Sequence, residues 1–123
     1  MKIALDSSAL IESLCGLQLP RLMDIVASGH RLLLPAQTLY EWRRGPRKPS
    51  KLTMEQRLFP PERILPFTER EAIVAAQLFK TAARARARSA DIAIAATSMT
   101  HDCLLWTFNR ADFTDLPGLR LLD

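Results

Sequence analysis

Short apolar runs alternate with amphipathic stretches along this chain. Residues 3–5 are apolar with no turn residue among them, which predicts a strand buried on both faces. Asp6 and two serines follow at once, and apolar residues then recur at helical spacing, at Ala9, Leu10, Ile11 and Leu14. A strand end, a carboxylate and a helix start therefore coincide at the edge of a parallel sheet where ligands usually bind. Taken alone, Asp6 is better explained as the cap of the helix that follows.

The same alternation continues to the C-terminus. It predicts helices over residues 20–29, 37–44, 69–85 and 90–100, and strands over residues 31–35, 64–65, 103–107 and 119–122. Strands that alternate with helices favour an α/β fold with a mainly parallel sheet and right-handed crossovers. We expect the helix over residues 69–85 to bury one apolar face, made of Ala72, Ile73, Ala76, Phe79 and Ala83.

The length of 123 residues is that of one domain, and we treat residues 1–123 as a single unit. Lys and Arg exceed Asp and Glu by 17 to 13, so the net charge is +4, which favours an acidic partner such as nucleic acid. Part of this charge lies at residues 43–51, which contain five basic residues, no acid, and two prolines that argue against regular structure. A solvated loop and a flexible arm that contacts phosphate both explain this segment.

The two cysteines, Cys15 and Cys103, lie among apolar residues and are expected to be buried, reduced thiols, in keeping with a cytoplasmic protein. His101 lies two residues from Cys103, but no second such pair accompanies it, which argues against zinc. Only three apolar residues separate Lys2 from Asp6, too few for a signal peptide. No apolar run approaches the length that spans a membrane, so no membrane association is expected.

Acidic residues fall where the predicted elements meet one edge of the sheet. In a parallel sheet with helical crossovers, strand C-termini and helix N-termini gather at the same edge. Four acids occupy such positions, namely Asp6, Glu41, Asp91 and Asp112. Each has an ordinary structural explanation: a cap, a surface pair with Arg44, a helix-dipole partner and a turn residue. Capping, however, does not require four acids from distant segments to converge.

Converging carboxylates repel and raise one another's pKa values unless a cation neutralises them. A cluster of oxygen donors without His or Cys suits a hard ion such as Mg²⁺ or Mn²⁺. Such an ion activates a water for in-line attack on a phosphodiester and stabilises the departing oxygen. The residues themselves therefore indicate metal-dependent phosphoryl chemistry.

Four motifs stand in a fixed order along the chain. They are LDSS at residues 5–8, Glu41 inside a predicted helix, DIAIAA at residues 91–96, and TFNRADF at residues 107–113, followed by Gly118 and Leu119. Over the whole chain these motifs resemble those of PIN-domain ribonucleases of the VapC toxin type. The order of the motifs and the Asn-x-x-Asp-Phe spacing carry this resemblance.

The resemblance implies an α/β/α sandwich with a central sheet of four to five short strands, often dimeric. It implies a toxin of a toxin–antitoxin pair that hydrolyses RNA with Mg²⁺ or Mn²⁺, leaving 5′-phosphate and 3′-hydroxyl ends. The four acids would be the catalytic, metal-binding set, while Ser8 and Asn109 would orient them by hydrogen bonds. A small VapB-like antitoxin whose tail blocks the acidic groove is the implied partner.

RNA contacts are expected from six basic residues, Arg43, Arg44, Arg47, Lys48, Arg88 and Arg110. Phe108 stands where many relatives of this family have a basic residue, so base stacking there would replace a phosphate contact. The alternative is a catalytically weak, RNA-binding or scaffold member of the same fold. A receiver-like phosphoacceptor is disfavoured because Ser7, rather than a second acid, follows Asp6. The scattered glycines exclude a dinucleotide-binding loop.

Overall fold

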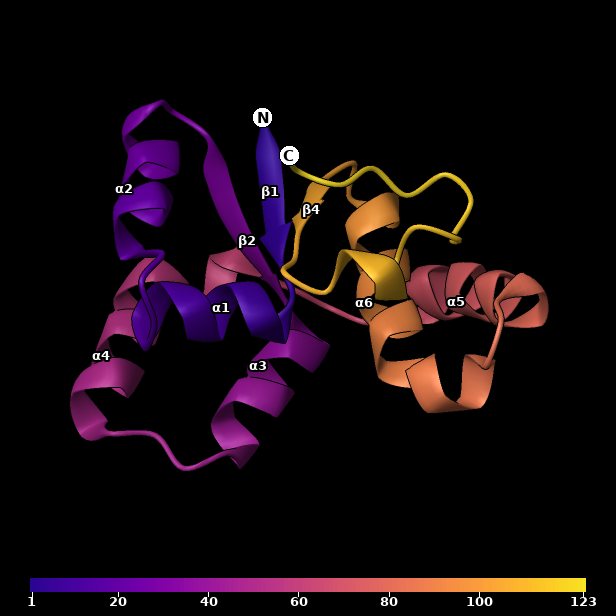
Figure 1. The fold of residues 1–123 in the computed structure, drawn as a ribbon, viewed down its shortest axis with the longest axis horizontal. Coiled ribbons are helices and arrows are strands. Elements are labelled where there is room, and N and C mark those ends of the chain that lie inside the picture. Colours follow the sequence, from indigo (N-terminus) through magenta and orange to yellow (C-terminus); the bar gives the residue numbers. More distant parts are fainter.

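The computed structural model describes all 123 residues and has a parallel four-stranded sheet at its centre. Figure 1 shows the sheet between two groups of helices. The strand order is β3-β2-β1-β4, and each neighbouring pair is parallel. The strands are β1 (Lys2–Leu5), β2 (Arg31–Pro35), β3 (Ile64–Leu65) and β4 (Leu104–Trp106).

Six α-helices and three short 3₁₀ helices complete the fold. The α-helices are α1 (Ser7–Leu14), α2 (Leu19–Ala27), α3 (Ala36–Arg44), α4 (Pro49–Leu58), α5 (Glu69–Thr81) and α6 (Ser89–Thr100). The 3₁₀ helices are η1 (Pro61–Arg63), η2 (Ala85–Arg88) and η3 (Arg110–Asp112). None of the helices combines the length and the apolarity that crossing a bilayer requires.

Alternation of side chains along the strands divides the core into two layers. One face of the sheet packs against α1 to α4 through residues that include Ile3, Leu5, Leu32, Leu34 and Trp106. The other face, with Ala4, Leu33 and Leu105, packs against α5 and α6. The small side chains of Ala95 and Ala96 are fully buried and let α6 approach the sheet closely. The predicted α/β/α sandwich around a parallel sheet is confirmed (Figure 1).

The basic segment at residues 43–51 is more ordered than the sequence suggested. Only residues 45–48 are irregular, because Arg43 and Arg44 end α3 and Pro49 begins α4. Proline is favoured in the first turn of a helix, where its missing N–H has no partner to lose. Pro49 therefore starts a helix that the sequence analysis did not predict, and Lys51 lies within it.

The apolar face predicted for α5 is wrong. The helix ends at Thr81 and buries Glu71 and Leu78, while the side chains expected inside are exposed, namely Ala72, Ile73, Ala76, Phe79 and Ala83. The reason is that α5 packs on α6 along a neighbouring stripe that includes Val74, Ala75 and Ala82. Ile73 and Phe79, which are 51% and 39% exposed, are left on the surface together with Phe67 at 40%.

Two smaller expectations also fail. The last predicted strand is reduced to a single bridge between Leu105 and Leu121. Cys15 is exposed because α1 ends at Leu14, whereas Cys103 is buried as expected. Burial raises the pKa of the Cys103 thiol to about 11 and keeps it protonated.

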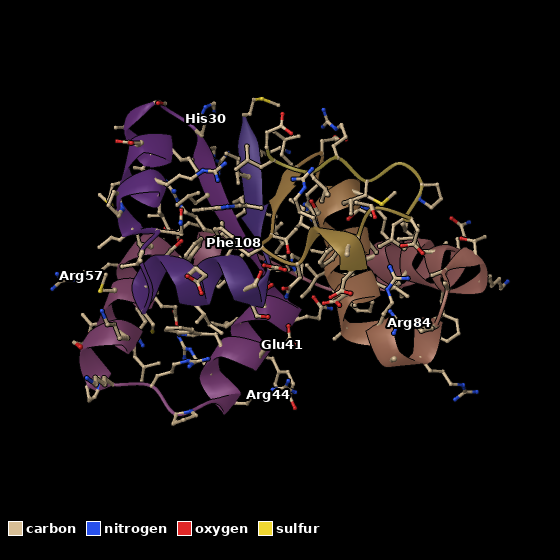
Figure 2. The ribbon with its side chains drawn as sticks, viewed as in Figure 1. His30, Glu41, Arg44, Arg57, Arg84 and Phe108 are labelled. Carbon is tan, nitrogen blue, oxygen red and sulfur yellow. The ribbon has the colours of Figure 1, made fainter.

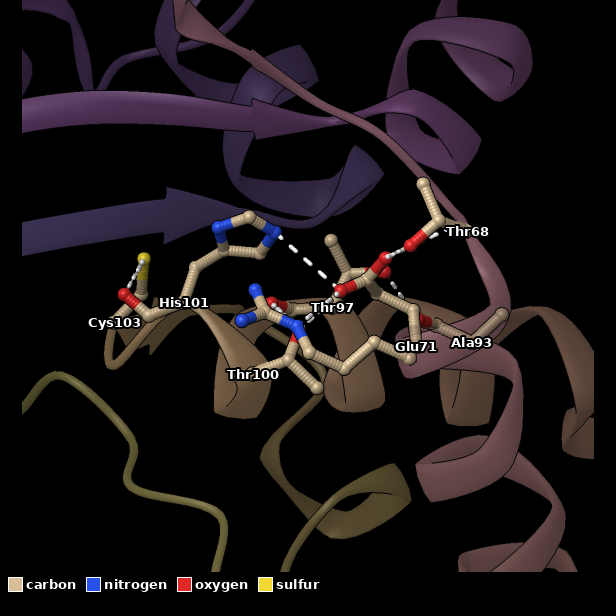
Figure 3. Close-up of polar contacts among 8 residues, drawn as sticks. Thr68, Glu71, Ala93, Thr97, Thr100, His101 and Cys103 are labelled. Carbon is tan, nitrogen blue, oxygen red and sulfur yellow. Dashed lines mark hydrogen bonds and ion pairs between the residues drawn. The ribbon is translucent and has the colours of Figure 1, made fainter.

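A buried carboxylate joins the start of α5 to the end of α6 (Figure 3). Glu71 accepts hydrogen bonds from the Thr68 amide at 2.8 Å, the Thr68 hydroxyl at 2.6 Å and the Thr100 hydroxyl at 3.0 Å. The first two contacts belong to a capping box that satisfies amides at the start of α5. This network lies at the end of α6 remote from Asp91 and fixes the packing of the two helices.

Candidate active site

Asp6 is held rigidly at the point where β1 gives way to α1. Its Oδ1 accepts hydrogen bonds from the Ala9 amide at 2.9 Å and the Ser8 hydroxyl at 2.7 Å. Its Oδ2 accepts a hydrogen bond from the Thr107 hydroxyl at 2.5 Å. Asp6 is therefore the cap of α1, as its local sequence indicated, and is also one of the acids at this edge of the sheet.

Thr107 is a site residue that the sequence analysis missed. Leu5 pairs with Trp106 between β1 and β4, so the next residues, Asp6 and Thr107, lie side by side. The Thr107 hydroxyl donates to Asp6 and accepts a hydrogen bond from the Asn109 amide at 2.9 Å. The register of two parallel strands was the missing information, although Thr107 does open the TFNRADF motif.

Ser8 makes the expected hydrogen bond to Asp6 and also accepts one from the Phe108 amide at 2.9 Å. Asn109 is exposed, and its main chain, rather than its side chain, makes the contact with Thr107. Ser8 and Thr107 thus connect the carboxylate of Asp6 to the loop that carries Asp112. The orientation of Asp6 is set by hydroxyl groups on both sides.

Asp91 lies in the first turn of α6, near enough to Asp112, Glu41 and Asp6 for their charges to act on it. Burial, followed by the charges of Asp112, Glu41 and Asp6, raises the pKa of Asp91 to about 6. Burial is the largest cause, and the three carboxylates add to it because like charges that lie near a carboxylate disfavour its ionised form. The charges of acids from three other segments therefore act on Asp91.

Glu41 approaches the same region from α3, and Figure 2 shows it on the side of α3 that faces α6. Burial raises the pKa of Glu41 and the charge of Asp6 adds to this, whereas Arg44 opposes it. Arg44 Nη2 lies 3.7 Å from Glu41 Oε2, while Oε1 is buried and has no hydrogen-bond partner. An acceptor of this kind is costly to leave unpaired.

The chemistry of this donor set fits a hard divalent cation. All the donors are carboxylate or hydroxyl oxygens, the unpaired Glu41 Oε1 lacks a partner, and a cation would relieve the repulsion that raises the Asp91 pKa. No three His, Cys, Asp or Glu side chains lie close enough together to form a ready-made metal site. Binding one ion would therefore require the carboxylates to draw together.

Arg88, expected to contact RNA, is instead buried. Its side chain is 8% exposed and forms a two-pronged ion pair with Asp115, with N···O distances of 2.6 and 2.9 Å. It also donates to the carbonyl oxygens of Ala83 and Asp112. A guanidinium with these four contacts is not available to a phosphate at the surface. Arg88 is therefore no longer a candidate for RNA contact.

The remaining basic candidates differ in how free they are. Arg43 pairs through two nitrogens with buried Glu55, and Arg47 lies 4.3 Å above the ring of Trp42. Arg110 donates to the Leu122 carbonyl, Arg44 lies over Tyr40, and Lys48 is exposed with no ion pair. Arg43 and Arg47 thus brace the α3–α4 turn, which explains part of the charge run without any ligand.

Phe108 is exposed on the loop after β4, next to the hydroxyls that hold Asp6. Its side chain is 41% exposed, and its ring centroid lies 5.9 Å from that of Trp106. Figure 2 shows it beside the start of the η3 loop. A planar apolar ring at this place offers a surface on which a nucleobase can stack.

Comparison with known proteins identifies the family of this chain. The model of the PIN domain family matches residues 3–119. No curated protein sequence matches the chain. FitAcB from Neisseria gonorrhoeae shares 26% identity with a TM-score of 0.72, with 98% of this chain and 96% of that chain aligned.

Two further solved structures share the fold at lower identity. VapBC2 from Rickettsia felis, bound to a DNA fragment from its promoter, has a TM-score of 0.76 at 16% identity and covers 99% of this chain and 98% of its own. DNA-bound VapBC from Salmonella typhimurium has a TM-score of 0.75 at 19% identity, covering 100% of this chain and 98% of its own. The family match spans nearly the whole chain and includes the segments that carry all four acids. This chain belongs to the PIN domain family.

Proposed function

We propose that this protein is an Mg²⁺- or Mn²⁺-dependent endoribonuclease, the toxin of a toxin–antitoxin pair. The observation that carries the proposal is that Asp91 is partly buried where the charges of Asp112, Glu41 and Asp6 act on it, so that burial first and these charges second raise its pKa to about 6. Membership of the PIN family and the likeness to toxin–antitoxin complexes support the same conclusion.

In this proposal Asp6, Glu41, Asp91 and Asp112 hold the divalent ion. When bound, the ion would supply Lewis-acid stabilisation of the phosphodiester and would activate water for the attack. Asp6 is preset by Ser8 and Thr107, so its carboxylate needs little rearrangement. In the metal-free protein the pKa of Asp91 is about 6, so binding of the ion below that pH would release the proton of Asp91. Ser8 and Asn109 remain the residues proposed to orient the acids by hydrogen bonds.

RNA would reach the acids past Phe108 and the exposed basic side chains. Lys48, Arg44 and Arg110 remain candidates for phosphate contacts, with Arg43 and Arg47 contributing charge from positions fixed by Glu55 and Trp42. Phe108 would stack on a base of an unpaired segment, where bases are accessible. These contacts favour single-stranded or looped RNA over a duplex.

A VapB-like antitoxin and a second copy of the chain are the proposed protein partners, and the cytoplasm is the proposed compartment. The solved relatives are complexes of the VapBC and FitAB type, which supports the antitoxin. The exposed rings of Phe67 and Phe79 line one mostly apolar hollow over α5 and the start of α6, the α5 patch, which supports a homodimer. The reduced state of buried Cys103 agrees with the cytoplasm.

Inducible expression in a bacterial host tests the proposed activity. Asparagine is an equally good helix cap, so Asp6→Asn keeps α1 intact while removing a carboxylate charge. We expect growth arrest and fragmented RNA from the wild type and from the exposed control Asp24→Asn, but from neither Asp6→Asn nor Asp91→Asn. Purified wild type should cut RNA with Mn²⁺ and stop in chelator. Cleavage by Asp6→Asn in chelator would contradict the proposal.

A catalytically weak RNA-binding or scaffold role is the second candidate. It is favoured by the absence of any three acids close enough to hold one ion as they stand. The two functions separate in one assay, because a scaffold binds RNA equally well as wild type and as Asp6→Asn and cuts it in neither form. A nuclease loses cleavage in the variant while retaining binding.

A further inference from the structure

One buried arginine connects three segments beside the acids. Arg88 is the last residue of η2 and directly precedes α6. Its Nη1 donates to the Ala83 carbonyl at 2.8 Å and to Asp115 Oδ2 at 2.9 Å, while Nη2 donates to the Asp112 carbonyl at 2.5 Å and to Asp115 Oδ1 at 2.6 Å. The side chain thus joins the end of α5, the start of α6 and the loop after η3.

Two of these segments carry acids of the candidate site. Asp91 lies three residues after Arg88 in the first turn of α6, and Asp112 is held by its own carbonyl oxygen. A planar guanidinium with two forked contacts fixes orientation as well as distance. The separation between the backbones of Asp91 and Asp112 is therefore set through Arg88.

Arg88 and Asp115 each favour the charged form of the other. The hydrogen bonds from Arg88 lower the pKa of Asp115, and the same contacts raise the pKa of Arg88. The positive charge also faces Asp112 and Asp91, so it offsets part of the repulsion within the acid cluster. The remaining nitrogen, Nε, is buried without a partner, so the guanidinium presents no donor to a phosphate outside.

We propose that Arg88, anchored by Asp115, is a positioning residue that holds the loop of Asp112 against the start of α6 so that both acids reach one ion. The inference rests on the proposed function, because it assigns the pair to the metal-dependent site. Lysine keeps the charge but supplies one compact ammonium in place of the fork, so it cannot make the four contacts together.

Calorimetric titration with Mn²⁺, without RNA, tests the role. The proteins are the wild type, Arg88→Lys, Asp115→Asn and the matched control Arg86→Lys, which changes an exposed arginine of the same η2 turn. Groups that orient metal ligands typically contribute 10–100-fold to affinity or activity. We expect Mn²⁺ affinity to fall by about 10-fold or more in both variants that break the pair and to change less than twofold in the control. Circular dichroism confirms that each variant is folded at the titration temperature.

RNA cleavage on the same proteins separates this inference from the nuclease proposal. Partial recovery of cleavage by Arg88→Lys in excess Mn²⁺, measured at a temperature where the metal-free variant is already fully folded, supports a positioning role, since the metal cannot then act by increasing the folded fraction. Lower melting temperatures with unchanged Mn²⁺ affinity in both Arg88→Lys and Asp115→Asn would overturn it.

If the wild type binds Mn²⁺ but cuts no RNA, the nuclease proposal fails and the affinities still decide the role of Arg88. A wild type that binds no Mn²⁺ overturns both. Should Arg88→Lys not fold, the Mn²⁺ affinity of Asp115→Asn alone decides the role of the pair.

Discussion

The acids of the site are held in two different ways. Asp6 receives hydrogen bonds from Ser8, Ala9 and Thr107, which stabilise its charge in a fixed direction. Asp91 and Glu41 are partly buried, and burial raises the pKa of each. One carboxylate is therefore preorganised, while the others carry repulsion that a cation would relieve.

Asp91→Asn should stabilise the metal-free protein at neutral and basic pH. The pKa of Asp91 rises from 3.8 to about 6 on folding, so its contribution favours the folded state below pH 3.8 and is lost as the pH rises through 6. The shift corresponds to at most about 3 kcal/mol, which solvent screening reduces to about 1 kcal/mol. Thermal unfolding in chelator should give a higher melting temperature for the variant at pH 8 and little difference at pH 4. Exposed Asp24→Asn is the control, and a variant less stable than wild type at pH 8 would contradict the repulsion.

Thr107→Val should destabilise the protein and impair the site. Valine keeps the shape but removes the donor to Asp6 and the acceptor for the Asn109 amide. Leaving the buried Asp6 oxygen unpaired costs about 1–3 kcal/mol, and the partly buried Asn109 amide loses its acceptor as well. Urea unfolding measures the loss, with exposed Thr53→Val on α4 as the control, whose hydroxyl contacts only the Pro49 carbonyl. Equal effects of the two substitutions would show that Thr107 has no special role.

At the scale of elements, the sequence predicted β1 to β4, the helix that follows Asp6 and the first turn of α6 well, but not the end of the chain, where the expected strand is a single bridge. These follow from apolar runs and local capping, which need no distant partner. It did not predict α4, because a proline that opens a helix and a proline that breaks one look alike without knowledge of the preceding turn. The face of α5 was misassigned because Ile73 and Phe79 are apolar yet exposed, while Glu71 is buried by its capping box.

Glu71 makes the stability of the α5–α6 packing depend on pH in the acidic range. Burial alone would raise the pKa of Glu71, but hydrogen bonds from Thr68, Thr100 and Arg70 outweigh it and lower the pKa from 4.5 to about 2. This contribution to stability is present above about pH 4.5 and is lost as the pH falls through 2. Urea unfolding between pH 6 and pH 2 should therefore show a steeper loss for the wild type than for Glu71→Gln. The exposed first-turn neighbour Glu69→Gln should follow the wild type, and parallel curves for all three would contradict the role of the network.

At the scale of the whole molecule, topology explains why the acids were predictable and the basic residues were not. A parallel sheet brings the ends of strands and the starts of helices to one edge, so the positions of Asp6 and Asp91 follow from element order alone. The partner of an arginine depends on packing between segments. Arg88 pairs with Asp115, and the guanidinium of Arg47 lies over the ring of Trp42. No rule of sequence spacing predicts either contact.

A homodimer formed through the α5 patch would be broken by a charge at its centre. Phe79→Glu buries a carboxylate in the proposed apolar contact, so we expect the mass in solution to fall from two chains to one. Light scattering coupled to size exclusion measures this. Leu17→Glu, at a residue 89% exposed near the α1–α2 turn, should leave the mass unchanged. A single-chain mass for the wild type at high concentration would contradict the dimer.

The proposed function requires that carboxylates from four segments close around one divalent ion. Anomalous diffraction from crystals soaked in Mn²⁺ tests it most directly, because the signal locates manganese without reference to activity. We predict a peak bounded by Asp6, Glu41, Asp91 and Asp112 in the wild type that is lost in Asp91→Asn. A peak elsewhere, or none at saturating Mn²⁺, would contradict it.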